Sequence, residues 1–364
     1  AFDKATALIA AALLAVSFWP LASSREALRA GMLPFFMVLA VWFFWQIVCN
    51  PCGEDGDATS QPPSSRLRMA GLVIGFALSL VATFHIYLAA RVAWLLFPLF
   101  LLYLALLYRS DFRRSWRPAV AGLLLAGLLL VPMFYYLSNN PYAQTRLSML
   151  SGTLDLVASG NLLPIINNAG EALLAFVWPG YGDQFLAYNI PGRPVFDLLT
   201  AVFFIIGLIV SLWRWRQPPY AFLLLWFATG IIPSLVTGST ANTTRNLAAL
   251  PAVYLLPTVG FVFAGRSLAR LFNLSQRTVL TTGAVAWLLI VAFVSARDYF
   301  CRWGEDPQVR GAYQHTLVEE LDYLQGQEIK NEPVVFSTVY PGPAHDASIA
   351  LVLAGQQAQN YRSL

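Results

Sequence analysis

The sequence has little charge and very little lysine. Only 12% of its 364 residues are charged, whereas 57% are hydrophobic; a soluble domain is typically about a quarter charged. Lysine occurs only at Lys4 and Lys330, and the remaining cations are arginines spread over short connections. This distribution lacks the basic patch that nucleic-acid binding requires. We therefore expect a protein for which water is not the main solvent, with membrane lipids as partners.

Cysteine, histidine and nucleotide-binding motifs are equally sparse. Cys49, Cys52 and Cys301 are too few for a disulfide framework. The Cys-Asn-Pro-Cys sequence at 49–52 has no further cysteine or histidine close by, which disfavours a metal site. No glycine-rich nucleotide loop and no nucleophile elbow is present. We accordingly predict neither a metal nor a cofactor.

Long apolar runs dominate what is present. Crossing the hydrocarbon core of a bilayer takes about 20 apolar residues, and about nine runs approach that length. They are 5–20, 31–49, 69–87, 90–108, 118–136, 197–213, 219–236, 247–264 and 279–294. The pattern predicts an all-α polytopic membrane protein with about nine transmembrane helices.

The distribution of arginine predicts the orientation, because short cytoplasmic loops are enriched in basic residues. The strongly basic connections, which we assign to the cytoplasm, contain Arg66, Arg68, Arg109, Arg113, Arg114, Arg117, Arg214, Arg216, Arg266, Arg270 and Arg277. The alternate connections, which we assign to the exterior, contain Arg25, Arg29, Arg91, Arg146, Arg193 and Arg245. We predict a multi-pass protein of the inner (plasma) membrane.

Two longer polar segments fall on the predicted outer side. The connection 137–196 is rich in turn signals, and the apolar stretch 169–177 within it is too short to span, which favours an interfacial or re-entrant helix. The segment 297–364 is polar, and the Val-Val-Phe-Ser-Thr-Val run from Val334 reads as a strand. We therefore divide the chain into a transmembrane domain, 1–296, and an extracytoplasmic C-terminal segment, 297–364, with a small α/β tail.

Polar residues beside the outer ends of the spans are the candidate site. Arginine suits phosphate because its planar guanidinium donates paired hydrogen bonds and stays charged. A carboxylate in a turn could act as a general base or bind a sugar hydroxyl. The candidate substrate-binding residues are Arg25, Arg29, Tyr87, Arg91, Asp183, Asn189, Arg193, Asn242 and Arg245.

Each candidate has a structural alternative. The arginines could instead reach lipid headgroups or cap helix ends. Asp183, in Trp-Pro-Gly-Tyr-Gly-Asp, could hydrogen-bond its own backbone, as aspartates in glycine-rich turns commonly do. Glu26 could form an ion pair with Arg25 or Arg29. The catalytic residue is thus left unknown, with Asp183 as the candidate.

Taken together, four short motifs resemble bacterial glycosyltransferase family 39, which belongs to the GT-C superfamily with the protein O-mannosyltransferases and the lipid A aminoarabinose transferase. They are Phe-Trp-Pro-Leu-Ala-Ser-Ser-Arg-Glu-Ala-Leu-Arg from Phe18, Tyr-Leu-Ala-Ala-Arg ending at Arg91, Tyr-Gly-Asp…Tyr-Asn-Ile-Pro-Gly-Arg-Pro from Tyr181, and Ile-Pro-Ser-Leu-Val-Thr…Asn-Thr-Thr-Arg-Asn…Leu-Pro-Ala-Val-Tyr-Leu-Leu-Pro from Ile232. The resemblance covers most of the chain.

The resemblance implies a GT-C-like helix bundle and an enzyme that transfers a sugar from a polyprenyl-phosphate donor to a lipid, glycan or protein acceptor on the outer face of the membrane. In this family, an acidic pair follows the first membrane helix, and this chain has no such loop near its start. The resemblance therefore implies that the run 5–20 corresponds to a later helix and that the chain is N-terminally truncated. A second departure is the Ala187-Tyr188-Asn189 stretch, where relatives often have Arg-His-Asn.

Two other classes of function remain open at this point. A secondary transporter would also be a helix bundle, with broken helices or buried charges near its middle. A lipid-linked sugar flippase or a sugar-polymer ligase would also present outward-facing arginines to a lipid phosphate.

Overall fold

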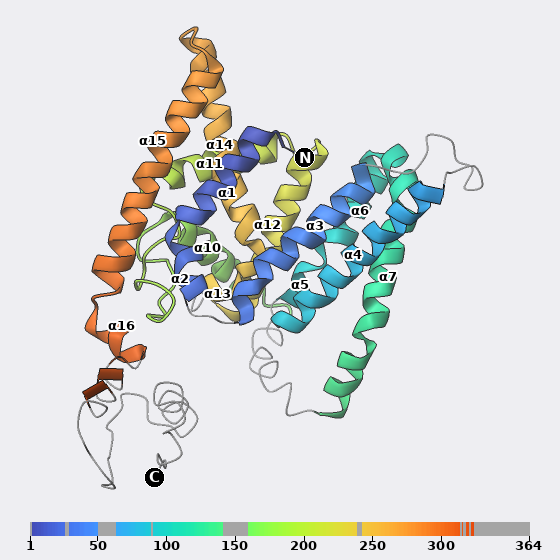
Figure 1. Cartoon of the computed structure of the whole chain (residues 1–364), viewed down its shortest axis with the longest axis horizontal. Helices are drawn as coiled ribbons and strands as arrows, with labels where there is room; N and C mark the ends of the chain where they lie inside the picture. The colour runs from blue at the N-terminus through green and yellow to red at the C-terminus, as the bar shows by residue number, and fades with distance from the viewer. Residues whose placement is uncertain are drawn as a thin grey trace.

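The computed structural model describes residues 2–25, 29–49, 63–88, 90–140, 159–238, 242–313, 315, 318–319 and 322–323. Every regular element within these ranges is helical (Figure 1). The elements are α1 (Lys4–Val16), α2 (Phe18–Arg25), η1 (Arg29–Met32), α3 (Leu33–Cys49), α4 (Pro63–Ile86), α5 (Ala90–Ala93), α6 (Leu96–Leu107), α7 (Arg109–Asn139), α10 (Leu163–Val177), α11 (Leu198–Trp213), α12 (Pro218–Thr237), α13 (Asn242–Arg245), η3 (Leu247–Ala249), α14 (Leu250–Leu271), α15 (Gln276–Ala296), η4 (Arg297–Trp303) and α16 (Pro307–Ala312).

The prediction of an all-α polytopic membrane protein is confirmed. Among the described residues, seven helices are long and apolar enough to cross a membrane, and α1 with α2 makes an eighth if this pair, bent by 55°, is one span. The predicted run 197–213 is the shorter apolar helix α11. All nine apolar runs of the sequence thus lie in helices. The stretch 169–177 is also helical, although its helix α10 begins earlier, at Leu163.

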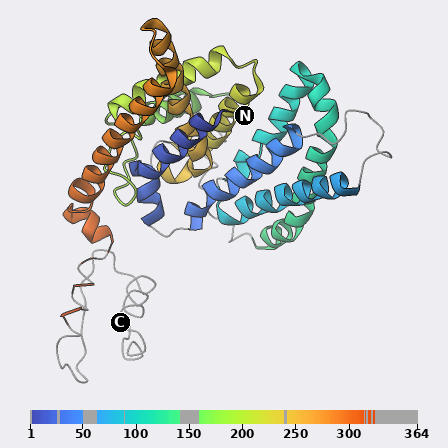
Figure 2. The ribbon, with the colours of Figure 1, turned by 45° about the horizontal axis from the view of Figure 1, so that its top comes forward.

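The helices form two groups (Figures 1 and 2). Helices α3, α4, α6 and α7 pack together in one group, whereas α1, α10, α11, α14 and α15 make up the other. Helix α12 contacts members of both groups and joins them. Trp226 of α12 is buried, and its indole nitrogen donates a 2.8 Å hydrogen bond to the carbonyl oxygen of Ala248 in η3. Helix α12 therefore holds η3, the element that precedes α14, in place.

Aromatic side chains fill the centre of the first group. The buried Phe44 ring lies 5.0 Å from the Phe97 ring and 5.5 Å from the Phe76 ring, measured between centroids. Phe222 of α12 lies 4.9 Å from Phe100, so the same cluster extends across the contact between the two groups. The Phe44–Phe97 and Phe222–Phe100 pairs are edge-to-face, an arrangement favoured over face-to-face stacking because of the ring quadrupoles.

The two ends of the bundle differ in composition. Figure 1 shows the α6–α7, α11–α12 and α14–α15 connections toward one end, and α2, α5, α13 and α16 toward the other. Asp3 pairs with Arg266 at the first end, and the Tyr103 and Tyr108 hydroxyls donate to the carbonyl oxygen of Arg216 there. The strongly basic connections that the structure describes therefore gather at one end, as the alternation of arginine predicted. We call the opposite end, with α2, α5, α13, η4 and α16, the site end.

At the C-terminal side, helix α15 continues without a break into η4, a π-helical turn. The boundary that we predicted at 296/297 thus falls inside one continuous helical stretch, and the domain division stays a prediction. The strand predicted at Val334, the acidic residue Glu26, Arg146 and Cys52 lie outside the described residues.

Candidate functional site

The segment 178–196 forms a compact turn at the site end because glycine permits it. The Gly180 amide donates to the Gly192 carbonyl oxygen at 2.8 Å, and the Gly192 amide donates to the Asp183 carbonyl oxygen at 3.2 Å. Gly180 and Gly192 have positive φ angles of 93° and 75°, which residues with a Cβ rarely adopt. A Cβ at Gly182 would lie 1.8 Å from the Arg193 carbonyl oxygen. The turn signals of the sequence thus specify a particular close crossing of the chain.

Asp183 fastens this turn to helix α13. Its carboxylate is buried, with 1% of the residue exposed. One oxygen accepts from the Phe185 amide at 2.9 Å, and the other accepts from the Thr243 amide at 3.0 Å and from the Thr243 hydroxyl. The contact with Phe185 is the local backbone hydrogen bond that we gave as the alternative for this residue. The carboxylate therefore acts as an acceptor for its neighbours inside the protein.

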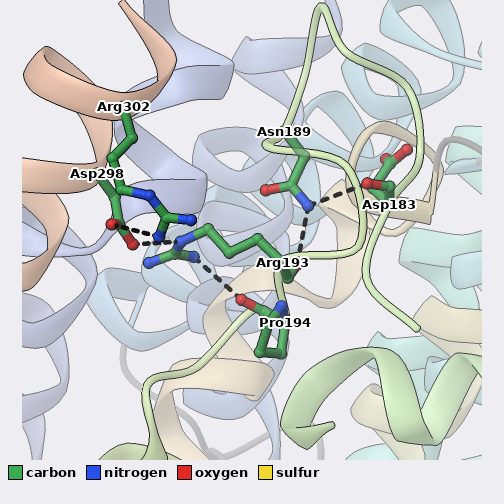
Figure 3. Close-up of polar contacts among 6 residues, drawn as sticks. All are labelled: Asp183, Asn189, Arg193, Pro194, Asp298 and Arg302. Atoms are coloured by element: carbon green, nitrogen blue, oxygen red, sulfur yellow. Dashed lines mark hydrogen bonds and ion pairs between the residues drawn. The ribbon is translucent and has the colours of Figure 1, made fainter. Parts of the chain in front are cut away.

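Asn189 holds the two arms of the turn together. Its side-chain amide donates to the Asp183 carbonyl oxygen at 3.1 Å and to the Arg193 carbonyl oxygen at 2.8 Å (Figure 3). Only 3% of Asn189 is exposed. The buried amide thus joins two backbone carbonyl groups of the turn, one of which, that of Asp183, also accepts from the Gly192 amide.

Arg193 connects the turn to η4. Its Nε lies 2.8 Å from Asp298 Oδ2, and one terminal nitrogen donates to the Pro194 carbonyl oxygen at 3.0 Å (Figure 3). The guanidinium carbon also lies 4.3 Å from the centre of the Phe18 ring. The second Asp298 oxygen lies 3.0 Å from Arg302. One buried carboxylate therefore serves two arginines from different elements.

Sequence reasoning missed Asp298. It follows the last apolar run by a few residues and is separated from Arg193 by more than one hundred positions, so no local spacing links them. A carboxylate at the end of an otherwise apolar span is a usable signal, because such a group needs a cationic partner.

Arg25 lies against three aromatic rings. Its guanidinium carbon is 5.7 Å from the centre of Tyr299, 5.6 Å from Trp303 and 5.3 Å from Tyr313. These are cation–π distances. Arg25 therefore helps to attach the residues that follow α15 to helix α2, in addition to any role toward a ligand.

Arg91 and Arg245 have a different environment, since neither forms an ion pair with a described residue. Arg91, in α5, is half-buried; its Nε has no hydrogen-bond partner among the described residues, and a terminal nitrogen lies 4.0 Å from the Met133 sulfur. Arg245, in α13, donates to the carbonyl oxygen of Thr237 at 3.2 Å and to its hydroxyl. Neither guanidinium group is thus neutralised by an ion pair with a carboxylate among these residues.

The fold brings the elements that carry these arginines together. Helix α5 packs against η3, which begins two residues after Arg245. Arg29 is exposed and begins η1, which packs against α3 and α4. Tyr87 is half-buried and packs against the main core. Asn242 begins α13. The predicted residues thus form two neighbouring sets: Asp183, Asn189 and Arg193 in the turn, and the arginines of α5 and α13 beside it.

A small cavity lies between these parts. It is lined by Trp19, Ala172, Ala175, Phe176, Asp183, Val195, Thr243 and Asn246. It leaves about 10 Å³ for the centre of a water molecule, which is roughly the space of one water. No three His, Cys, Asp or Glu side chains of the described ranges are grouped as metal ligands would be. Because it has room for only about one water, the cavity is too small for a sugar.

The fold defines the class of protein: a multi-pass helical membrane protein with a polar turn and arginines at one end. Residues 1–146 match the family model described as dolichyl-phosphate-mannose-protein mannosyltransferase. Over these residues the chain is similar to that family, which bears out the resemblance given above for this part. No curated protein matches the sequence significantly.

A solved structure is also similar to this chain. It is the archaeal oligosaccharyltransferase AglB from Archaeoglobus fulgidus, in complex with an inhibitory peptide and a dolichol-phosphate. The sequence identity is 18%, the TM-score is 0.49, and the alignment covers 93% of this chain and 48% of that one. This chain therefore spans about half the length of that protein.

Proposed function

We propose that this chain is a membrane glycosyltransferase that transfers a sugar from a polyprenyl-phosphate-linked donor to a lipid, glycan or protein acceptor on the outer face of the cytoplasmic membrane. The family match over residues 1–146 supports the class of reaction. The observation that carries the site assignment is the pair Arg91 and Arg245, which lie on neighbouring elements without a carboxylate partner among the described residues.

The physical argument concerns the cost of a guanidinium in such a position. A half-buried cation at the edge of a membrane domain is unfavourable unless an anion compensates it. A lipid phosphate is an anion that stays at the interface while its chain remains in the hydrocarbon region. We propose that Arg91 and Arg245, together with Arg29 of η1, receive this phosphate and neutralise the charge that develops on it as the sugar leaves.

The other candidates have supporting roles in this proposal. Asp183 and Asn189 hold the turn 178–196 by buried hydrogen bonds, which favours positioning over direct proton transfer. Arg193 and Arg25 attach η4 to the turn and to α2. Tyr87 and Asn242 remain candidate contacts on the elements beside Arg91 and Arg245.

A secondary transporter is the alternative. The observation that favours it is the 55° bend between α1 and α2 at Ser17, because broken helices form the substrate sites of transporters. However, the hydroxyl of Ser17 already donates to the Leu13 carbonyl oxygen at 2.6 Å. One backbone carbonyl freed by the bend is therefore already satisfied within the protein, and the glycosyltransferase remains the better proposal.

The test is binding of a labelled polyprenyl phosphate to the protein reconstituted in liposomes. We expect Arg91→Ala and Arg245→Ala each to weaken binding by roughly tenfold or more, because each removes charge-assisted hydrogen bonds to phosphate. Arg277→Ala is the matched control, since Arg277 lies at the basic end of the bundle, and it should leave binding unchanged. Binding that is equal in all three variants, or absent in the unmodified protein, would reject the proposal.

A further inference from the structure

The turn 178–196 is fastened at two points to elements that are distant in sequence. At one point, Asp183 accepts two hydrogen bonds from Thr243 in α13. At the other, Arg193 pairs with Asp298 in η4 at 2.8 Å. Helix α13 ends at Arg245, and η4 begins the residues that follow the last long helix. The turn therefore connects the start of the C-terminal segment with the helix that carries Arg245.

The connection is rigid because its members are buried and satisfied. The side chains of Arg193 and Asp298 are only 10% and 8% exposed. The two ends of the turn are joined by Asn189, which donates to the carbonyl oxygens of both Asp183 and Arg193. A shift of Arg193 cannot be absorbed at the crossing, because Gly182 lies directly against the Arg193 carbonyl oxygen. Movement at Asp298 would thus displace Asp183 as well.

Helix α2 provides a second route between the same two points. Phe18 lies under the Arg193 guanidinium and forms a small buried cluster with Ala22, Trp303 and Val309. Its neighbour Trp19 donates from its indole nitrogen to the Thr243 carbonyl oxygen at 3.1 Å. Thr243 is therefore held on its amide and hydroxyl by the turn and on its carbonyl by α2.

We propose that Asp298 is a positioning residue: by holding Arg193, it sets the turn 178–196 and, through Asp183 and Thr243, the orientation of the helix that presents Arg245. This role makes the start of the C-terminal segment a part of the site's scaffold. The expected effect of Asp298 on lipid binding rests on the function proposed above. The structural coupling between Asp298 and Thr243 does not depend on that function.

The first experiment is hydrogen exchange measured by mass spectrometry on the reconstituted protein. Asp298→Asn keeps the shape of the side chain but removes the charge that binds Arg193 and Arg302. We expect at least tenfold faster exchange in peptides covering 180–193 and also 242–246, with 276–296 unchanged. The Thr243 amide is a direct reporter, because it donates to Asp183 in the native structure.

Two variants give the comparison. Arg297→Ala changes an exposed residue beside Asp298 and should leave both peptides protected. Thr243→Val removes the hydroxyl donor to Asp183 at the other end of the connection, leaving the amide donor, and should speed exchange in 242–246 while the η4 peptide stays protected. If Asp298→Asn does not fold, Arg193→Gln removes the same ion pair from the other side and gives the same test.

Faster exchange confined to 297–303, with 242–246 as well protected as in the unmodified protein, would overturn the inference, since Asp298 would then stabilise only its own turn. Polyprenyl-phosphate binding is measured on the same samples, and we expect Asp298→Asn to weaken it several-fold. If 242–246 exchanges no faster in Asp298→Asn than in the unmodified protein, the positioning role is refuted. If 242–246 does exchange faster but the unmodified protein binds no lipid, only the proposed function is refuted.

Discussion

Replacement of Gly207 tests how closely helices α11 and α14 must approach. A Cβ at Gly207 would lie 1.8 Å from the Leu256 carbonyl oxygen, and one at Gly260 would lie 2.0 Å from the Phe203 carbonyl oxygen. Close contacts of carbon with carbonyl oxygen are normally about 3.3–3.6 Å. In Gly207→Ala, the two backbones must therefore separate by roughly 1.5 Å. Overpacking of this kind lowers the free energy of unfolding by about 1–3 kcal/mol.

The matched control is Gly127→Ala in α7, because nothing lies within 4 Å of a Cβ at that position. Both substitutions gain the same intrinsic helix propensity, about 0.8–1.0 kcal/mol. The difference between the two variants therefore isolates the steric cost. We expect Gly207→Ala to be less stable than Gly127→Ala by about 1–3 kcal/mol.

The assay is reversible unfolding in detergent, followed by circular dichroism, for the unmodified protein and both variants. The crossing also matters for the site, because α11 begins directly after the turn 178–196 and α14 begins just after Arg245. Lipid binding should thus weaken in Gly207→Ala at temperatures where the protein is still folded. Equal stability of the two alanine variants would refute the reasoning, since it would mean that the helices can separate without loss.

Two further perturbations test individual contacts. In Thr243→Val, the buried Asp183 carboxylate loses a hydroxyl donor, so we expect a loss of about 1–3 kcal/mol in unfolding free energy, measured by chemical denaturation; a change near zero would show that this hydrogen bond adds nothing. For the contact at the basic end, hydrogen bonds from Thr6 and the charge of Arg266 hold the pKa of Asp3 below its usual value. Because the folded-state pKa is the lower one, this stabilisation is complete above about pH 4 and is lost as the pH falls through the folded-state pKa. Thermal melting of Asp3→Asn against pH should therefore lack the acid-dependent component of the unmodified protein, and parallel profiles would contradict this assignment.

Much of the fold could be predicted from the sequence because the bilayer imposes a simple requirement on it. Each span must be a helix with satisfied backbone groups and an apolar surface, so runs of sufficient length and low charge already indicate where the long apolar helices of the described residues lie. The alternation of arginine likewise indicated which connections gather at one end, because the enrichment of arginine can be counted in each connection separately. The short helix within 137–196 also followed from local hydrophobicity.

The pairing of polar groups was decided by the tertiary structure alone. Asp183 has the same sequence signal whether it faces a substrate or bonds to Thr243, which is 60 positions away. Arg193 is a candidate phosphate ligand by its type, but Asp298 already compensates its charge. Conversely, Arg91 and Arg245 become the stronger candidates because no described carboxylate reaches them. Spacing along a chain records only near neighbours, whereas the partner of a buried charge is set by how the helices pack.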